Sequence, residues 1–154
     1  MDWERLADAE RLELPKDYRE FVESYGGGEI DEYLSISTPP VPGSPYGDLL
    51  ERVDPALSDC QELGALLGGQ DLPLLLPFAD SASSDVAFWL RTGAADSWRV
   101  AVFRRQAPWG VNRWTVFDGG MAEFCLAVLT GVVDPFSERI AGSGPHVFVS
   151  WRDL

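Results

Sequence analysis

The chain has 154 residues and a net charge of −13, from 25 acidic and 12 basic side chains. This length, with a hydrophobic content of 45%, indicates one globular domain with an ordinary core. The excess of acids argues against binding to nucleic acid or to an anionic membrane surface. No apolar run is long enough for a membrane span, and the charged first residues lack the pattern of a signal peptide, so we expect a cytosolic protein.

The charges are unevenly distributed along the sequence. Residues 1–32 carry 11 acids and 4 bases, and residues 46–85 carry 8 acids and 1 base. Residues 86–113 hold one acid and five arginines. A surplus of carboxylates is compatible with simple solubility. It also suits a basic partner, since the negative field of the protein would accelerate their encounter.

Two helices are predicted at the start of the chain. The first is short and contains Trp3 and Leu6. The second begins at Pro15, whose missing N–H costs nothing at a first helical position. Its buried face is predicted from four aromatic or aliphatic residues at helical spacing, namely Tyr18, Phe21, Val22 and Tyr25.

Three glycines, Gly26–Gly28, follow this helix directly. Gly26 suffices to end the helix, because glycine adopts a positive φ without a Cβ clash. Gly27 and Gly28 therefore indicate either a second tight turn or the close approach of another element. We expect the triplet to turn the chain sharply, so that three acids are displayed beside the sheet; these are Glu29, Asp31 and Glu32. A strand is predicted at 33–37.

The middle of the chain contains a proline-rich loop and a helical region. Residues 38–47 hold four prolines, and we interpret them as a structured surface loop in preference to a polyproline ligand. Residues 48–68 are expected to be helical in two pieces, broken near Asp54-Pro55. The second piece starts either at Pro55 or at Ser58, which has a capping-box spacing to a glutamine three residues later.

The second half of the chain predicts a strand meander and a final helix. Strands are expected at 74–79, 86–91, 98–104 and 114–117, and an amphipathic helix follows from Met121. Segregated elements of this kind favour an α+β fold: a single domain with a mainly antiparallel sheet of about four to six strands and helices packed against it. Residues 1–136 form the body, and residues 137–154 are a C-terminal extension whose pattern allows one more strand in the same domain.

A search for catalytic and metal-binding patterns finds no enzyme motif. The sequence contains no nucleophile elbow and no phosphate-binding loop, and calcium-loop and zinc spacings are absent. The one histidine, His146, has no partner motif and is interpreted as a surface or turn residue. Cys60 and Cys125 are interpreted as buried free thiols. We therefore expect no catalytic site, metal or cofactor.

Two polar clusters remain as candidates for binding. In the first, Asp80 and Asp85 bracket three serines, which either satisfy their own backbone or contact a partner. In the second, tryptophans and arginines alternate over residues 89–114. This alternation can indicate base stacking, but the charge of the chain favours core tryptophans with solvent-facing arginines. The tryptophans are Trp89, Trp98, Trp109 and Trp114.

The order of several motifs resembles the SUKH superfamily. They are LPKDYREFVESYGGGEI, PLLLPFADSASSDVAFW, the strand from Trp98 to Val102, and WTVFDGGMAEFCLAVLTG. The similarity runs from about Trp3 to Phe136. The chain departs from the family pattern in the serine run Ser81–Ser84 and in the tail after Phe136. The resemblance implies a non-enzymatic α+β domain, since members include a fungal regulator of cell-wall synthesis and many bacterial immunity proteins.

This resemblance implies a cytoplasmic immunity protein that binds and neutralises a basic toxin, for example a nuclease, of a polymorphic or contact-dependent toxin system. The alternative is a general interaction or regulatory scaffold of the same fold without a toxin partner. We expect a monomer or weak dimer. The predicted partner-binding residues are the five acids Glu29, Asp31, Glu32, Asp80 and Asp85.

Overall fold

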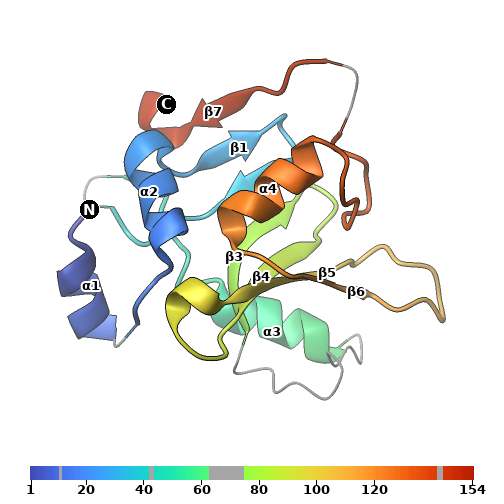
Figure 1. Ribbon diagram of the computed structural model, residues 1–154, viewed down its shortest axis with the longest axis horizontal. Coiled ribbons are helices and arrows are strands. Elements are labelled where there is room, and N and C mark those ends of the chain that lie inside the picture. The colour runs from blue at the N-terminus through green and yellow to red at the C-terminus, as the bar shows by residue number, and fades with distance from the viewer. Residues whose placement is uncertain (11, 42–43, 63–74, 142–143) are drawn as a thin grey trace.

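The structure is a computed structural model that describes residues 1–10, 12–41, 44–62, 75–141 and 144–154. Seven strands form one sheet in the order β6-β5-β4-β3-β2-β1-β7, and every neighbouring pair is antiparallel. Figure 1 shows the sheet and its helices. The fold is therefore α+β with an antiparallel sheet, as predicted. The elements are α1 (Trp3–Glu10), α2 (Lys16–Tyr25), β1 (Gly28–Ile30), β2 (Leu34–Ile36), α3 (Val53–Glu62), β3 (Leu75–Ser81), β4 (Val86–Leu90), η2 (Ala95–Ser97), β5 (Arg99–Phe103), β6 (Trp114–Phe117), α4 (Met121–Leu129), β7 (Phe148–Ser150) and η3 (Trp151–Asp153).

The predicted meander is confirmed, but the strand count is higher than expected. Strands β3 to β6 and β2 lie within two residues of their predicted bounds. Strand β1 was not predicted, because three residues led by a glycine show no alternation long enough to detect. The tail supplies the seventh strand: β7 pairs with β1 in the register Gly28↔Ser150 and Ile30↔Phe148.

Helix α2 forms over the predicted residues, with one error in its buried face. Tyr18 and Val22 are buried and Phe21 is half-buried, but Tyr25 is 56% exposed. Tyr25 is the last residue of the helix, and its ring contacts Phe21 at a tilt and Phe148 edge-on. Pro15 is the residue just before the first helical position.

The prediction of two helical pieces broken at Asp54-Pro55 is wrong, because residues 49–52 form a turn and one helix follows them. Helix α3 runs from Val53 to Glu62 and includes Pro55 in its first turn, where a proline loses no helical hydrogen bond. Ser58 consequently lies inside the helix and does not cap it. The rest of the predicted helix, to residue 68, falls outside the described residues.

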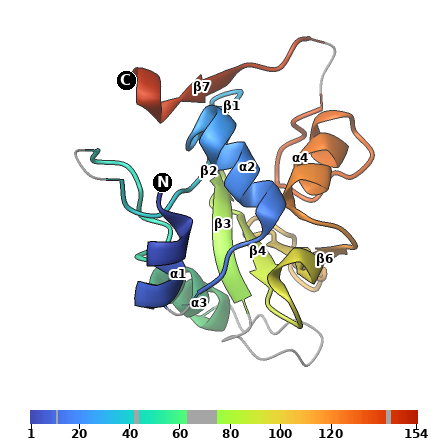
Figure 2. The same cartoon turned by 60° about the vertical axis from the view of Figure 1, so that its left-hand side comes forward.

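Apolar side chains cover both faces of the central strands. One face packs against α1, α2 and α4 around Tyr18, Trp89 and Phe124. The opposite face packs against α3 and is centred on Phe88 and Trp114. In Figure 2, α2 crosses in front of the strands and α4 lies to its right.

Three of the four tryptophans predicted to be core residues are buried, namely Trp89, Trp98 and Trp114. The fourth, Trp109, is 99% exposed in the loop between β5 and β6, so the prediction is wrong for this residue. Cys125 is a buried free cysteine, and burial raises the pKa of its thiol to about 12.

The glycine triplet makes room for the tail. Gly26 has a φ of +76° and ends α2, and its N–H donates to the carbonyl of Val22 at 2.8 Å. A Cβ on Gly27 would lie 2.7 Å from the ring of Trp151, and a Cβ on Gly28 would lie 2.2 Å from the carbonyl oxygen of Val149. Of the two expectations for Gly27 and Gly28, the structure supports close approach of another element, and that element is the tail.

Candidate functional site

The five predicted binding acids lie in three different environments. Asp85 is fully buried and directly precedes the first residue of β4. Asp31 and Glu32 form the turn between β1 and β2, where both have positive φ. Glu29 and Asp80 each lie opposite Ser35 of β2 in the register, so their side chains share one face of the sheet. These residues share a negative charge, but the fold places them in different surroundings.

Asp85 is a structural carboxylate, which corrects its assignment to partner binding. The backbone N–H of Arg105 donates to one of its oxygens, and the backbone N–H of Ser137 donates to the other, each at 2.8 Å. The hydroxyls of Ser81 and Ser137 donate at 2.8 and 2.6 Å. Because both oxygens are occupied and no surface is exposed, Asp85 has no capacity left for a partner in this structure.

Asp31 holds the tail against the sheet. Its carboxylate accepts the backbone N–H of Val147 at 2.7 Å and lies 2.5 Å from Nδ1 of His146. Nε2 of His146 lies 2.9 Å from the carbonyl oxygen of Leu129 at the end of α4. Both neighbours of the ring are acceptors, so protonated histidine, with two donors, matches this environment. We name His146, Asp31 and Leu129 the tail latch.

Two pKa shifts follow from the latch. The hydrogen bond to Asp31, and then that to the Leu129 carbonyl, raise the pKa of His146. Burial raises the pKa of Asp31, but the hydrogen bonds from Val147 and His146 outweigh burial and the net pKa is lowered. The latch is therefore fully charged between the lowered pKa of Asp31 and the raised pKa of His146.

The latch predicts that stability falls at alkaline pH. A histidine with a raised pKa in the folded state stabilises fully below its unfolded pKa, which is about 6.5. This contribution is lost as pH rises through the folded pKa. We expect His146→Ala to destabilise the protein near pH 5.5 and to have a smaller effect at pH 8.5. The measurement is the free energy of unfolding of both proteins at each pH.

NMR titration provides the control for this prediction. His146 is the only histidine in the chain, so its ring resonance is unambiguous. A titration midpoint at or below the value of a free histidine would contradict the latch.

The face shared by Glu29 and Asp80 carries a salt bridge that the sequence analysis missed. Arg52 precedes α3, and its Nε lies 2.8 Å from Asp48 Oδ2. The Nη1 of Arg52 also pairs with Asp80. The only sequence signal for this cluster was the spacing of four residues between Asp48 and Arg52.

The pKa values of these side chains reflect their burial and mutual contacts. Burial, and then repulsion from Asp48 and Glu29, raise the pKa of Asp80 despite the attraction of Arg52. Burial lowers the pKa of Arg52, but Asp48 and Asp80 outweigh burial and raise it overall. Asp48 and Asp80 share one guanidinium, and Glu29 lies close enough to repel Asp80, so this part of the sheet face has three carboxylates for one arginine.

A cavity of about 300 Å³ lies against this face, and we name it the acidic cavity. Its polar walls include Glu29, Ser35 and Asp48, and Arg52 closes one side. Its aromatic wall is formed by Tyr46 and Trp151, whose rings are stacked with centroids 4.9 Å apart and planes 16° apart. The proline-rich loop and η3 bring these two rings together from distant parts of the sequence.

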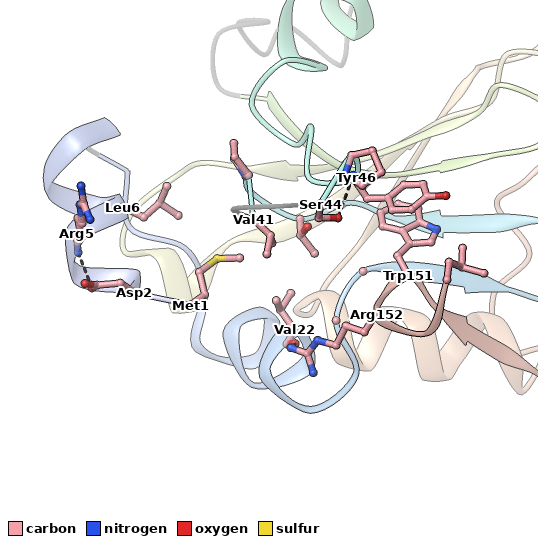
Figure 3. A pocket seen from close by; sticks show the side chains of 16 residues that line it. Met1, Asp2, Arg5, Leu6, Val22, Val41, Ser44, Tyr46, Trp151 and Arg152 are labelled. Carbon is pink, nitrogen blue, oxygen red and sulfur yellow. Dashed lines mark hydrogen bonds between the residues drawn. The ribbon is translucent and has the colours of Figure 1, made fainter.

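A larger cavity of about 830 Å³ is also lined by Tyr46 and Trp151. In Figure 3, Met1, Leu6 and Val41 line it together with this ring pair. Arg152 lies beside Val22, and its guanidinium donates to the carbonyls of Val22 and Glu23 at 2.7 and 3.1 Å. Arg152 therefore caps α2 and helps to fix the tail.

The fold and these cavities define an α+β protein with an acidic, aromatic-lined depression on one face of a single sheet. No family model, no curated protein and no solved structure matches the chain. Within residues 1–10, 12–41, 44–62, 75–141 and 144–154, no group of three or more His, Cys, Asp or Glu side chains is arranged to hold a metal ion. Over the same ranges, no helix has the length and apolar character needed to cross a membrane.

Proposed function

We propose that the protein is a non-enzymatic, cytoplasmic immunity protein of the SUKH type. It neutralises a basic protein toxin by covering the substrate-binding surface of the toxin. The observation that carries this proposal is the negative sheet face around Glu29, Asp48 and Asp80, which has one arginine among three carboxylates. The resemblance of the sequence motifs to immunity proteins supports the same function.

Electrostatics gives the proposal its physical basis. A protein with a net charge of −13 attracts a cationic partner, and carboxylates presented on one face orient that partner as it docks. A nuclease toxin is built to bind phosphates, so it offers the positive surface that such a face would cover. Neutralisation by occlusion needs no catalytic group on this chain.

Charge reversal tests the proposal. The double variant Glu29→Lys with Glu32→Lys is expected to weaken toxin binding by roughly tenfold or more, which corresponds to about 1.4 kcal/mol. Both side chains are outside the core, so the thermal midpoint should stay nearly unchanged. Asp31 is left intact because its loss would release the tail. The measurements are calorimetric affinity for the toxin captured from the native host at low salt, and protection of cells that express this toxin.

A matched control is Glu4→Lys with Glu13→Lys, which makes the same change in net charge at exposed positions near the N-terminus. If both double variants weaken binding equally, the overall charge matters and the sheet face does not. If neither variant loses affinity or protection, the sheet face is not the binding surface, and if the parent protein gives no protection, the proposed function is rejected.

A second candidate, a general interaction module without a toxin, is favoured by Trp109. This side chain is 99% exposed in the arginine-rich segment between β5 and β6. Tryptophan is enriched among the residues that dominate binding at protein interfaces. A native complex that survives the charge reversals but is lost in Trp109→Ala would support this alternative.

A further inference from the structure

The acidic cavity has the chemistry of a receptor for one cationic side chain. We propose that it receives an arginine side chain of the bound protein, with the guanidinium stacked on the Tyr46–Trp151 pair and bonded to Glu29. This inference rests on the proposed function, since it identifies the contact through which a basic partner is held. Three features of the cavity support it.

The first feature is the aromatic wall. The rings of Tyr46 and Trp151 stack on each other and line the cavity together with Pro45, and each ring keeps one face that the other ring does not cover. A cation over such rings is attracted to their faces, and the planar guanidinium of arginine also stacks on them. A volume of about 300 Å³ is at the lower limit of ligand pockets, which suits a single side chain.

The second feature is a carboxylate whose charge is not neutralised. Glu29 is contacted by the hydroxyl of Ser35 at 3.5 Å, which is a weak hydrogen bond. The nearby Arg52 is already shared by Asp48 and Asp80, so it does not neutralise Glu29. A carboxylate in this position favours a donor that carries a positive charge and disfavours an anion.

The third feature is a hydroxyl without a partner beside the same arginine. Ser37 is 1% exposed, and its Oγ makes no hydrogen bond. It lines a cavity of about 200 Å³ together with Arg52 and Asp80, and Arg52 also lines the acidic cavity. Ser35 lies in β2 and Ser37 directly follows this strand; because they are two residues apart in extended chain, their side chains point to the same face of the sheet. Ser37 does not line the acidic cavity itself, so its unpaired oxygen adds an acceptor to the adjoining part of the same polar face.

Two small probes that differ in charge test the proposal. We would titrate the protein with N-acetyl-arginine amide and with N-acetyl-citrulline amide, which has nearly the same shape without the charge. The readout is NMR shifts of the Trp151 indole and the Tyr46 ring. The arginine probe is expected to bind saturably with a Kd of about 1 mM, and the citrulline probe at least roughly tenfold more weakly.

Variants locate the site and keep the test independent of the toxin. Glu29→Gln should weaken the arginine probe by roughly fivefold or more, and Tyr46→Leu should also weaken it. Glu138→Gln, an exposed acid elsewhere, should change nothing. Equal affinity for the two probes, shifts that avoid the ring pair, or an unaffected Glu29→Gln would overturn the inference. If those results came with intact toxin protection, the proposed function would stand, whereas arginine selectivity without protection would reject that function alone.

Discussion

Changing Asp85 to asparagine is expected to lower the free energy of unfolding by about 3 kcal/mol. Each oxygen of the Asp85 carboxylate accepts one backbone N–H, from Arg105 on one side and from Ser137 on the other. An asparagine amide has only one oxygen, so whichever way it is turned its NH₂ group meets one of those N–H donors. The midpoint of thermal unfolding should therefore fall on the order of 10 °C, measured by calorimetry at neutral pH.

Asp118→Asn is the matched control for this change. Asp118 is exposed in the turn before α4, so the same substitution there should leave the midpoint within about 1 °C of the parent. If Asp85→Asn were equally harmless, the carboxylate would not be what ties β4, the β5–β6 loop and residue 137 together.

The structural role of Asp85 could not be predicted from the sequence, although the fold could. The fold could be predicted because strands and helices leave local patterns in the sequence. Alternation of apolar and polar residues identified strands β3 to β6, and helical spacing identified α2 and α4. The partners of Asp85 come from residues 20 and 52 positions away. A carboxylate beside three serines looks the same in a sequence whether it faces solvent or backbone N–H groups.

The candidate site was predictable only in part for the same reason. Glu29 and Asp80 were selected by charge, and they do lie on one sheet face. The aromatic wall joins Tyr46 to Trp151 across more than 100 residues, and the tail latch joins Asp31 to His146 across a similar separation. No local pattern encodes either contact, because each depends on where β7 joins the sheet.

The glycine triplet is a sequence feature that reflects this contact with the tail, but the sequence alone did not show which of two causes explains it. A single glycine explains the end of α2, so the other two required either a turn or a close neighbour. The spacing of the residues cannot distinguish these causes. The structure does, because a Cβ at Gly27 or Gly28 would meet η3 or β7.

Changing Gly28 to alanine is accordingly expected to destabilise the protein by about 3 kcal/mol. The new Cβ would lie 2.2 Å from the carbonyl oxygen of Val149 and 2.7 Å from the ring of Phe148, and a backbone oxygen cannot rotate away. Strand β7 must move from β1, which removes the aromatic wall of the acidic cavity because Trp151 follows β7 directly. Hydrogen exchange at the Asp31 and Trp151 amides, which bond to Val147 and Gly27, should accelerate along with the fall in stability.

Gly144→Ala separates this steric effect from a general intolerance of the tail to alanine. Gly144 lies in the same tail, and a Cβ there would have no neighbour within 4 Å. It should therefore leave both the unfolding free energy and the exchange rates unchanged. If Gly28→Ala behaved like Gly144→Ala, the tail would not be packed against the triplet, and the acidic cavity would lose the element that closes it. Because the cavity needs β7 in position, Gly28→Ala should also abolish binding of the arginine probe, although the substituted residue contacts no ligand.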